Sequence, residues 1–151
     1  MQLFKNQVRR NLNDSLLAWK NLSRIESAMQ AKLAEHYKRF NLTQPQYEVL
    51  ALLWVNPEGL TQKEITEKLQ WSKGNTTGVL VRMVEKDFLS RETVIEDKRF
   101  HKVILTHKGR NLSDKIIPQI ENIISDLFVS ILSVRERRIL SEILAITFDG
   151  L

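Results

Sequence analysis

Residues 60–105 constrain the fold more than any other part of this 151-residue chain. Thr61 and Glu64 have the spacing of a capping box, in which a hydroxyl and a carboxylate satisfy the first free amides of a helix. Ser72 is placed to cap a second helix. Two β-prone runs follow, at residues 88–94 and 100–105, and they flank a charged tip at residues 95–99. The segment therefore predicts two short helices followed by a hairpin.

The second of these helices has a composition that suits contact with a nucleic-acid duplex. It opens with Lys-Gly-Asn-Thr-Thr-Gly at residues 73–78, although each glycine costs about 1 kcal/mol relative to alanine in a helix. A helix that reads a DNA groove benefits from this composition, because small residues allow close approach and Asn, Thr and Lys supply short donors and acceptors. The alternative is a surface helix of low propensity that binds nothing. The order of the elements favours a winged helix-turn-helix, whose second helix enters the major groove.

Long helices are expected on both sides of this unit. Apolar residues from Val8 to Leu33 recur mostly at three or four positions and predict a helix over roughly residues 4–38. Part of its apolar stripe should need a partner chain, because so long a helix extends beyond what a small domain covers. Thr43 and Thr106 are placed to cap two further helices, and Ser133 with Glu136 forms a second capping box before the last one. The helix after Ser72 is expected to bury Val79, Leu80, Met83 and Val84.

Composition narrows the class of protein. The length favours one domain, and the absence of cysteine excludes disulfides, thiolate metal sites and thiol redox sensing within these residues. The net charge is +5, and the excess of Lys and Arg lies in residues 1–40 and 61–110, which fits a polyanionic partner. No apolar run approaches the ~20 residues of a membrane span, and residues 1–10 lack the apolar core of a signal peptide. We therefore expect a cytoplasmic protein with no membrane partner.

The sequence carries no pattern typical of an enzyme. It has no Gly-rich phosphate loop, no nucleophile elbow and no paired His and acid spacing. His36, His101 and His107 are far apart in the sequence, with no cysteine and no cluster of acids beside them. We predict no catalytic residue, no metal site and no cofactor.

Four stretches of the chain together resemble a known family. They are Leu-Thr-Gln-Pro-Gln-Tyr-Glu-Val-Leu-Ala-Leu-Leu at 42–53, Leu-Thr-Gln-Lys-Glu-Ile-Thr-Glu-Lys-Leu at 60–69, residues 76–91, and Asp-Lys-Arg-Phe-His-Lys-Val-Ile-Leu-Thr-His-Lys-Gly-Arg at 97–110. The chain is similar to the multiple antibiotic resistance regulator (MarR) family of winged-helix transcription factors. The last stretch is the most specific, because it resembles the wing motif of that family. The resemblance extends over nearly the whole chain when the long flanking helices are included.

The resemblance implies a mainly α fold with a small β-hairpin wing and a homodimer that binds double-stranded DNA. Residues 43–105 would form the winged helix-turn-helix, and residues 1–40 and 107–151 the helical dimerisation region of a single domain. Two reading helices would face successive major grooves of a pseudo-palindromic site. Carried over residue by residue, the DNA-binding positions are Lys73, Asn75, Thr76, Thr77, Arg82, Asp97, Lys98 and Arg99. Arg99 would enter the minor groove, held in position by Asp97.

The resemblance also leaves alternatives open. Asp87 stands where the family usually has Gly, at a turn that requires the left-handed conformation. The family often binds small aromatic or anionic ligands in a crevice, and the aromatic residues that would line it here are Trp19, His36, Tyr37, Phe40 and Trp54; simple core packing is the alternative for each. A repressor released by such a ligand, a regulator without a ligand, and a helical protein-interaction module are therefore all kept as hypotheses.

Overall fold

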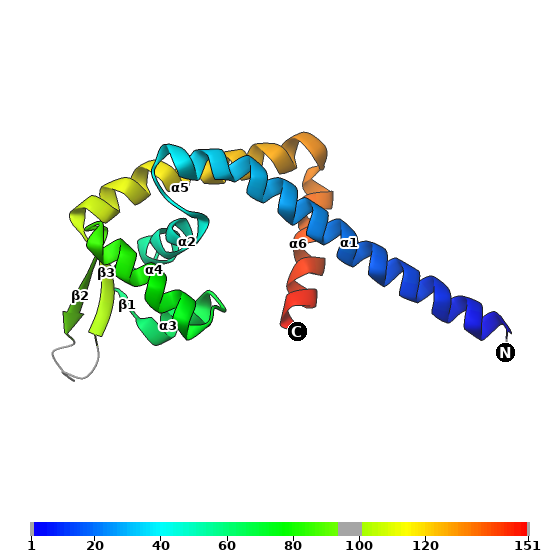
Figure 1. Cartoon of the computed structure of the whole chain (residues 1–151). Coiled ribbons are helices and arrows are strands. Elements are labelled where there is room, and N and C mark those ends of the chain that lie inside the picture. Colours follow the sequence, from blue (N-terminus) through cyan, green and yellow to red (C-terminus); the bar gives the residue numbers. More distant parts are fainter. Residues whose placement is uncertain (1, 94–100, 151) are drawn as a thin grey trace. The chain divides into compact units, whose positions relative to one another are not determined.

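The computed structural model describes residues 2–93 and 101–150, with side chains for residues 13–92 and 101–150 (Figure 1). It is mainly helical. The elements in chain order are α1 (Gln2–Arg39), α2 (Gln44–Trp54), β1 (Leu60–Thr61), α3 (Gln62–Lys68), α4 (Lys73–Glu85), β2 (Leu89–Thr93), β3 (His101–Leu105), α5 (His107–Ile131) and α6 (Val134–Asp149). The chain divides into two compact units, Met1–Gln44 and Pro45–Leu151, and each is described by itself.

The first unit is essentially the predicted long helix. α1 ends in a turn at which Asn41 adopts φ 54°, and the amide of Leu42 donates to the carbonyl of Tyr37 at 2.9 Å. Five large apolar side chains in its middle stretch stand exposed: Leu16, Leu17, Trp19, Leu22 and Ile25. The expected excess of apolar surface on this helix is therefore present along its described part.

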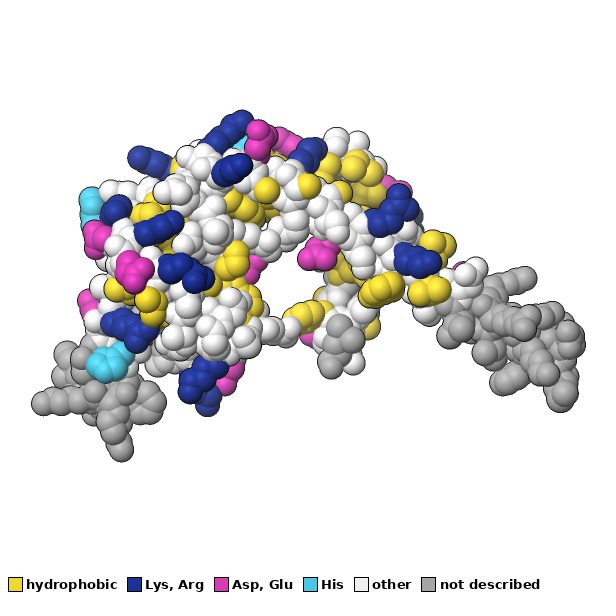
Figure 2. All heavy atoms as spheres, in the orientation of Figure 1, with side chains coloured by type: hydrophobic (Ala, Val, Ile, Leu, Met, Phe, Trp, Pro, Cys, Tyr) yellow, Lys and Arg dark blue, Asp and Glu magenta, His cyan; other side chains and the backbone are white. Residues whose placement is uncertain are grey.

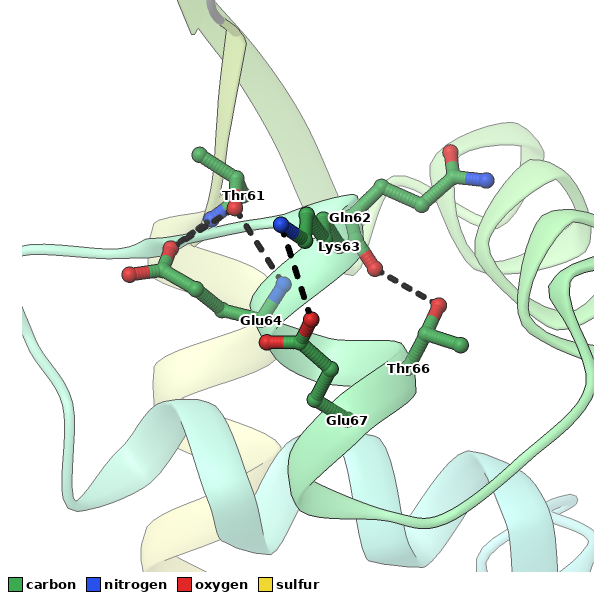
Figure 3. A network of polar contacts seen from close by, with 6 residues as sticks. All are labelled: Thr61, Gln62, Lys63, Glu64, Thr66 and Glu67. Carbon is green, nitrogen blue, oxygen red and sulfur yellow. Dashed lines mark hydrogen bonds and ion pairs between the residues drawn. The ribbon is translucent and has the colours of Figure 1, made fainter.

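Capping side chains start four helices, α3, α4, α5 and α6, where the sequence predicts them. In Figure 3 the carboxylate of Glu64 turns back to Thr61, whose backbone amide donates to Glu64 Oε2 at 2.7 Å. These hydrogen bonds from the backbone and side chain of Thr61 lower the pKa of the Glu64 carboxyl. Ser72 and Thr106 cap α4 and α5, and Ser133 forms the second capping box with Glu136. Local pairs of residues therefore define these four helix starts.

The sheet has one strand more than the sequence predicts. β3 is the central strand, antiparallel to β2 over the five pairs from Leu89 with Leu105 to Thr93 with His101, as the predicted hairpin requires. β1 pairs on its other side, with Leu60 opposite Val103. Gly59 leads into this strand with φ 76°, and a Cβ there would overlap the Ile104 side chain and the Val103 carbonyl. β1 consists of two residues, which are too few to show a strand pattern in the sequence. Its pairing with β3 in the structure identifies it as a strand.

The core of the second unit joins the helices to one face of the sheet. α3 contacts α4, β1 and β3, while α4 contacts β2 and α5 contacts β3. The buried apolar side chains of this unit are Val49, Leu50, Leu53, Leu60, Ile65, Val79, Leu80, Met83, Leu89, Val103, Ile116, Ile117 and Ile120. The expectation for Val84 was wrong, because this side chain is exposed. The buried stripe of α4 instead begins one turn earlier, at Thr76.

The start of α5 is hydrogen-bonded to residues at the C-terminal ends of α4 and α2. Thr106 Oγ1 donates to the Asp87 carbonyl at 2.7 Å, and Lys108 Nζ donates to the Lys86 carbonyl at 2.7 Å. Arg110 Nη1 donates to the carbonyl of Trp54, the last residue of α2, at 3.0 Å. The basic stretch Lys108–Arg110 that resembles the family motif therefore has a structural role, since its cations satisfy free carbonyls at helix C-termini.

Two negative findings concern the described part of the chain. No single helix there is long and apolar enough to cross a membrane, although α5 and α6 together meet that test across a bend of 115°. Residues 2–93 and 101–150 hold no group of His, Cys, Asp and Glu that could bind a metal ion.

The turn after α4 requires the left-handed conformation predicted for Asp87. Asp87 has φ 60°, its amide donates to Val84 and the amide of Phe88 donates to the Met83 carbonyl at 2.9 Å, which is a Schellman motif. We expect Asp87→Gly to raise the free energy of unfolding by about 1 kcal/mol, because glycine adopts this φ without strain. Urea denaturation measures the change. The control is Glu85→Gly, two residues earlier at the end of α4, which should lower the free energy of unfolding. A lower free energy of unfolding for Asp87→Gly would contradict the argument.

Candidate DNA-binding surface

α4 presents one polar face to solvent and one buried face to the core. Lys73, Asn75, Thr77 and Arg82 are exposed, whereas Val79, Leu80 and Met83 are buried. The guanidinium of Arg82 lies over Gly78, since a Cβ on that glycine would be 3.6 Å from Arg82 Nη1. Four of the residues predicted to bind DNA therefore share the accessible side of this helix.

Thr76 corrects the sequence prediction. Its side chain is 0% exposed, and its hydroxyl bonds to Thr66 Oγ1 at 3.0 Å and to the Ser72 carbonyl at 3.2 Å. Because Thr66 lies on α3, these bonds tie the two helices together from inside. Thr76 therefore packs α4 against α3 and is not available to a base. The error arose because a threonine beside exposed Asn75 and Thr77 cannot be assigned to a face without knowing the rotation of the helix.

Gln62 and Arg91 join this surface although the sequence did not single them out. Gln62 Nε2 donates to Thr77 Oγ1 at 2.7 Å, and Arg91 Nη2 donates to Gln62 Oε1 at 3.4 Å. One amide side chain on α3 thus connects the exposed face of α4 with strand β2. Their positions in the sequence could have pointed to this surface. Gln62 directly follows the capping residue of α3, and Arg91 lies in the strand that precedes the predicted wing.

Several cations lie on this helix and on the neighbouring elements of the second unit. Lys63, Lys73, Arg82, Arg91 and Lys102 come from α3, α4 and the sheet, and Lys63 pairs with Glu67 at 3.7 Å on the exposed side of α3. A shallow hollow between α3 and α4 is lined by Gln62, Lys63, Thr66, Glu67 and Lys73. Figure 2 shows Lys and Arg side chains spread over the surface of the molecule. A duplex laid on α4 would therefore meet donors and positive charge from three elements.

Some predicted site residues stay untested. Asp97, Lys98 and Arg99 lie outside the described residues. The suggested ligand pocket combines residues of both units. Trp19 is 64% exposed, His36 and Phe40 are half-buried, and Tyr37 is buried and lines a hollow formed by residues 30–44. Trp54 belongs to the second unit, where its indole Nε1 donates to Asp114 Oδ1 at 2.7 Å. That bond gives Trp54 a packing role, and the pocket itself remains a prediction.

Known proteins share both the sequence pattern and the fold. A family model, described as the MarR family, matches residues 42–101, which include α2, β1, α3, α4, β2 and the first residue of β3. The organic hydroperoxide resistance transcriptional regulator of Bacillus subtilis (strain 168) is 34% identical over 94 residues, covering 60% of this chain and 63% of that protein. An HTH-type transcriptional regulator of Bacillus cereus (strain ZK / E33L) is 28% identical over 128 residues, covering 85% of this chain and 84% of that protein.

Solved structures of low sequence identity show the same fold. A DNA complex of MepR from Staphylococcus aureus aligns with a TM-score of 0.79 at 24% identity and covers 87% of this chain and 96% of that one. The transcriptional regulator SlyA gives a TM-score of 0.79 at 22% identity, with coverage of 88% and 92%. The matched segment contains the capped helices and the polar face of α4 described above. On this evidence the chain is similar to the MarR family over residues 42–101, and it shares the fold of solved transcriptional regulators of that family.

Proposed function

We propose that this regulator is a homodimeric repressor that binds a pseudo-palindromic operator in the cytoplasm and leaves it when a small ligand binds. The observation that carries the DNA-binding part is the exposed face of α4, on which Lys73, Asn75, Thr77 and Arg82 stand above a buried apolar back. An α-helix of this kind fits the major groove, and its capped N-terminus directs free amides toward phosphates.

Exposed apolar surface supports the homodimer. α6 buries none of its residues, and its exposed large apolar side chains are Val134, Ile139, Ile143, Leu144, Ile146 and Phe148. α1 exposes five more, and Figure 2 shows hydrophobic side chains at the surface of both helices. Monomeric proteins rarely expose large apolar patches, and each of these two helices, taken by itself, carries several such side chains. A second copy of the chain would cover them and set the two α4 helices about one DNA turn apart.

The ligand-controlled release rests on the family resemblance. One similar protein is named as an organic hydroperoxide resistance regulator, and one protein of the same fold is described as a regulator of a multidrug efflux pump. A thiol mechanism does not carry over, because these 151 residues contain no cysteine. A ligand would act by binding one spacing of the two reading helices more tightly than another. The second candidate, a regulator without a ligand, shares the same DNA-binding surface.

Selection of bound DNA from a random duplex pool tests the proposal. We expect a pseudo-palindromic site whose affinity falls steeply with added salt, because each neutralised phosphate releases counterions. Selection of unrelated sequences with equal affinity would reject a specific operator, and no binding at all would favour the protein-interaction module. Titration of the complex with a panel of aromatic anions, followed by tryptophan fluorescence and operator release, separates the two regulators.

The wing makes its own testable contribution. We expect Arg99→Ala to weaken binding to the selected operator by about 10-fold or more, because a minor-groove arginine supplies both charge and shape readout. Electrophoretic mobility shift or fluorescence anisotropy gives the dissociation constant. The matched control is Arg138→Ala, which removes an equal charge from an exposed pair with Glu142 on α6. Equal effects of the two substitutions would mean that Arg99 acts only through net charge.

A further inference from the structure

The hydroxyl of Thr77 is already occupied within the protein. Thr77 Oγ1 donates to the Lys73 carbonyl at 2.8 Å and accepts from Gln62 Nε2 at 2.7 Å. A hydroxyl has one hydrogen and two lone pairs, so only one lone pair and the γ-methyl group remain for a ligand. Thr77 therefore has no hydrogen to donate to the acceptor atoms that guanine, adenine and thymine present in the major groove.

Val81 lies one helical turn after Thr77 on the same face of α4. Its side chain is 43% exposed, whereas the apolar residues Val79, Leu80 and Met83 already fill the core side of the helix. Valine offers methyl groups and no hydrogen-bonding atom. The exposed face thus carries two methyl-bearing side chains one turn apart, at the positions where a reading helix meets base edges.

Residue 78, which lies between Thr77 and Val81 in the sequence, has no side chain. That residue is Gly, and a Cβ there would lie only near the tip of the Arg82 side chain. Gly74 precedes Thr77 on the same side, and a Cβ there would meet nothing within 4 Å. The backbone of α4 can therefore approach a base pair closely at Gly74, and at Gly78 only the end of the Arg82 side chain has to move, which short methyl-bearing side chains need if they are to reach a base.

Thymine is the base whose major-groove edge carries a methyl group. The rise from residue 77 to residue 81 along a helix is about 6 Å, and successive bases in one strand are about 3.4 Å apart. Two methyl-bearing side chains at this separation match methyl groups about two base steps apart. Contact between them would bury apolar surface on both partners.

We propose that Thr77 and Val81 read thymine methyl groups, so that each half-site of the operator is selected for thymines about two steps apart. Gln62 is the positioning residue of this reading face, because its amide uses one lone pair of the Thr77 hydroxyl and fixes the side chain with its methyl group and one lone pair left for a ligand. The inference rests on the proposed function, since it assumes that α4 enters the major groove.

Replacing single thymines of the selected duplex with deoxyuridine tests the inference, because this change removes only the C5-methyl group. We expect two positions in each half-site at which the change weakens binding about fourfold. Val81→Ala should abolish the preference for thymine at one of them, and Thr77→Ser, which keeps the hydroxyl, should abolish it at the other. The matched control is Val55→Ala, an exposed valine outside α4, which should leave both preferences intact.

The outcomes separate the two proposals. If the wild-type protein binds no duplex, the proposed function fails. If it binds a selected operator but discriminates nowhere between thymine and deoxyuridine, the inference is overturned while the proposed function stands. If discrimination persists in both Val81→Ala and Thr77→Ser, other residues read the methyl groups and the assignment to this face is wrong.

Discussion

Replacing Ile143 and Ile146 with aspartate is expected to produce a monomer that binds the operator at least about 100-fold more weakly than the wild type. Both side chains are exposed on α6, within one turn of each other and on the same face as Ile139. Two buried carboxylates at a dimer interface would have to be desolvated without partners, which opposes association. A monomer then holds one half-site alone and loses the effective concentration that the first contact gives the second.

Analytical ultracentrifugation and fluorescence anisotropy measure the two parts of this prediction separately. The matched control is Ser141→Asp, which adds one carboxylate to the opposite face of α6 and should leave both the dimer and the affinity near wild type. A wild-type chain that sediments as a monomer would reject the homodimer outright. A monomeric aspartate variant with undiminished operator affinity would instead show that dimerisation is not needed for binding. Circular dichroism confirms that the variants remain helical.

Gly109→Ala is expected to lower the free energy of unfolding by about 3 kcal/mol. Gly109 lies in the first turn of α5, where an added Cβ would overlap the carbonyl oxygen of Phe88. That carbonyl cannot move away freely, because it accepts the Thr106 amide at 3.1 Å. The neighbouring Asp87 carbonyl is held in turn by the Thr106 hydroxyl at 2.7 Å. The methyl group must therefore displace backbone that several hydrogen bonds fix.

Gly74→Ala provides a matched control for this experiment. Gly74 occupies the first turn of α4, and a Cβ there meets nothing within 4 Å. The same substitution should therefore leave stability unchanged or raise it by up to about 1 kcal/mol, because alanine has the higher helix propensity. Urea denaturation of both variants measures the difference. If the two substitutions had equal effects, the close approach of α5 to Phe88 would not explain why position 109 is glycine.

Much of the fold follows from patterns that span a few residues. The helix starts at Thr61, Ser72, Thr106 and Ser133 were predicted correctly, because a capping side chain bonds an amide only three residues away. The strained turn at Asp87 was also predicted, since a left-handed residue closes a helix through bonds to its own last turn. The paired strands beside the wing were located to within one residue at each described end.

The same sequence reasoning could not settle which side chains of α4 face outward. Four of its predicted contact residues are exposed, but Thr76 is buried against Thr66 of α3. Val84 differs in the other direction, because it is exposed where burial was expected. Threonine and valine are compatible with either environment, so composition alone does not fix the rotation of a short helix. Packing against α3 and the sheet decides it.

By itself the sequence determined the helix starts, the turn at Asp87, the hairpin strands and the resemblance to the MarR family. Each of these depends on local hydrogen bonds or on a motif that is contiguous in the chain. Only the tertiary structure decided that β1 pairs with β3, that Gly109 lies against Phe88, and that Gln62 joins Thr77 to Arg91. These contacts link residues 15 to 43 positions apart: the bond from Gln62 to Thr77 spans 15 positions, and the pairing of Leu60 with Val103 spans 43. They form only when separate elements pack, because the apolar core that holds α3, α4 and the sheet together sets their distances.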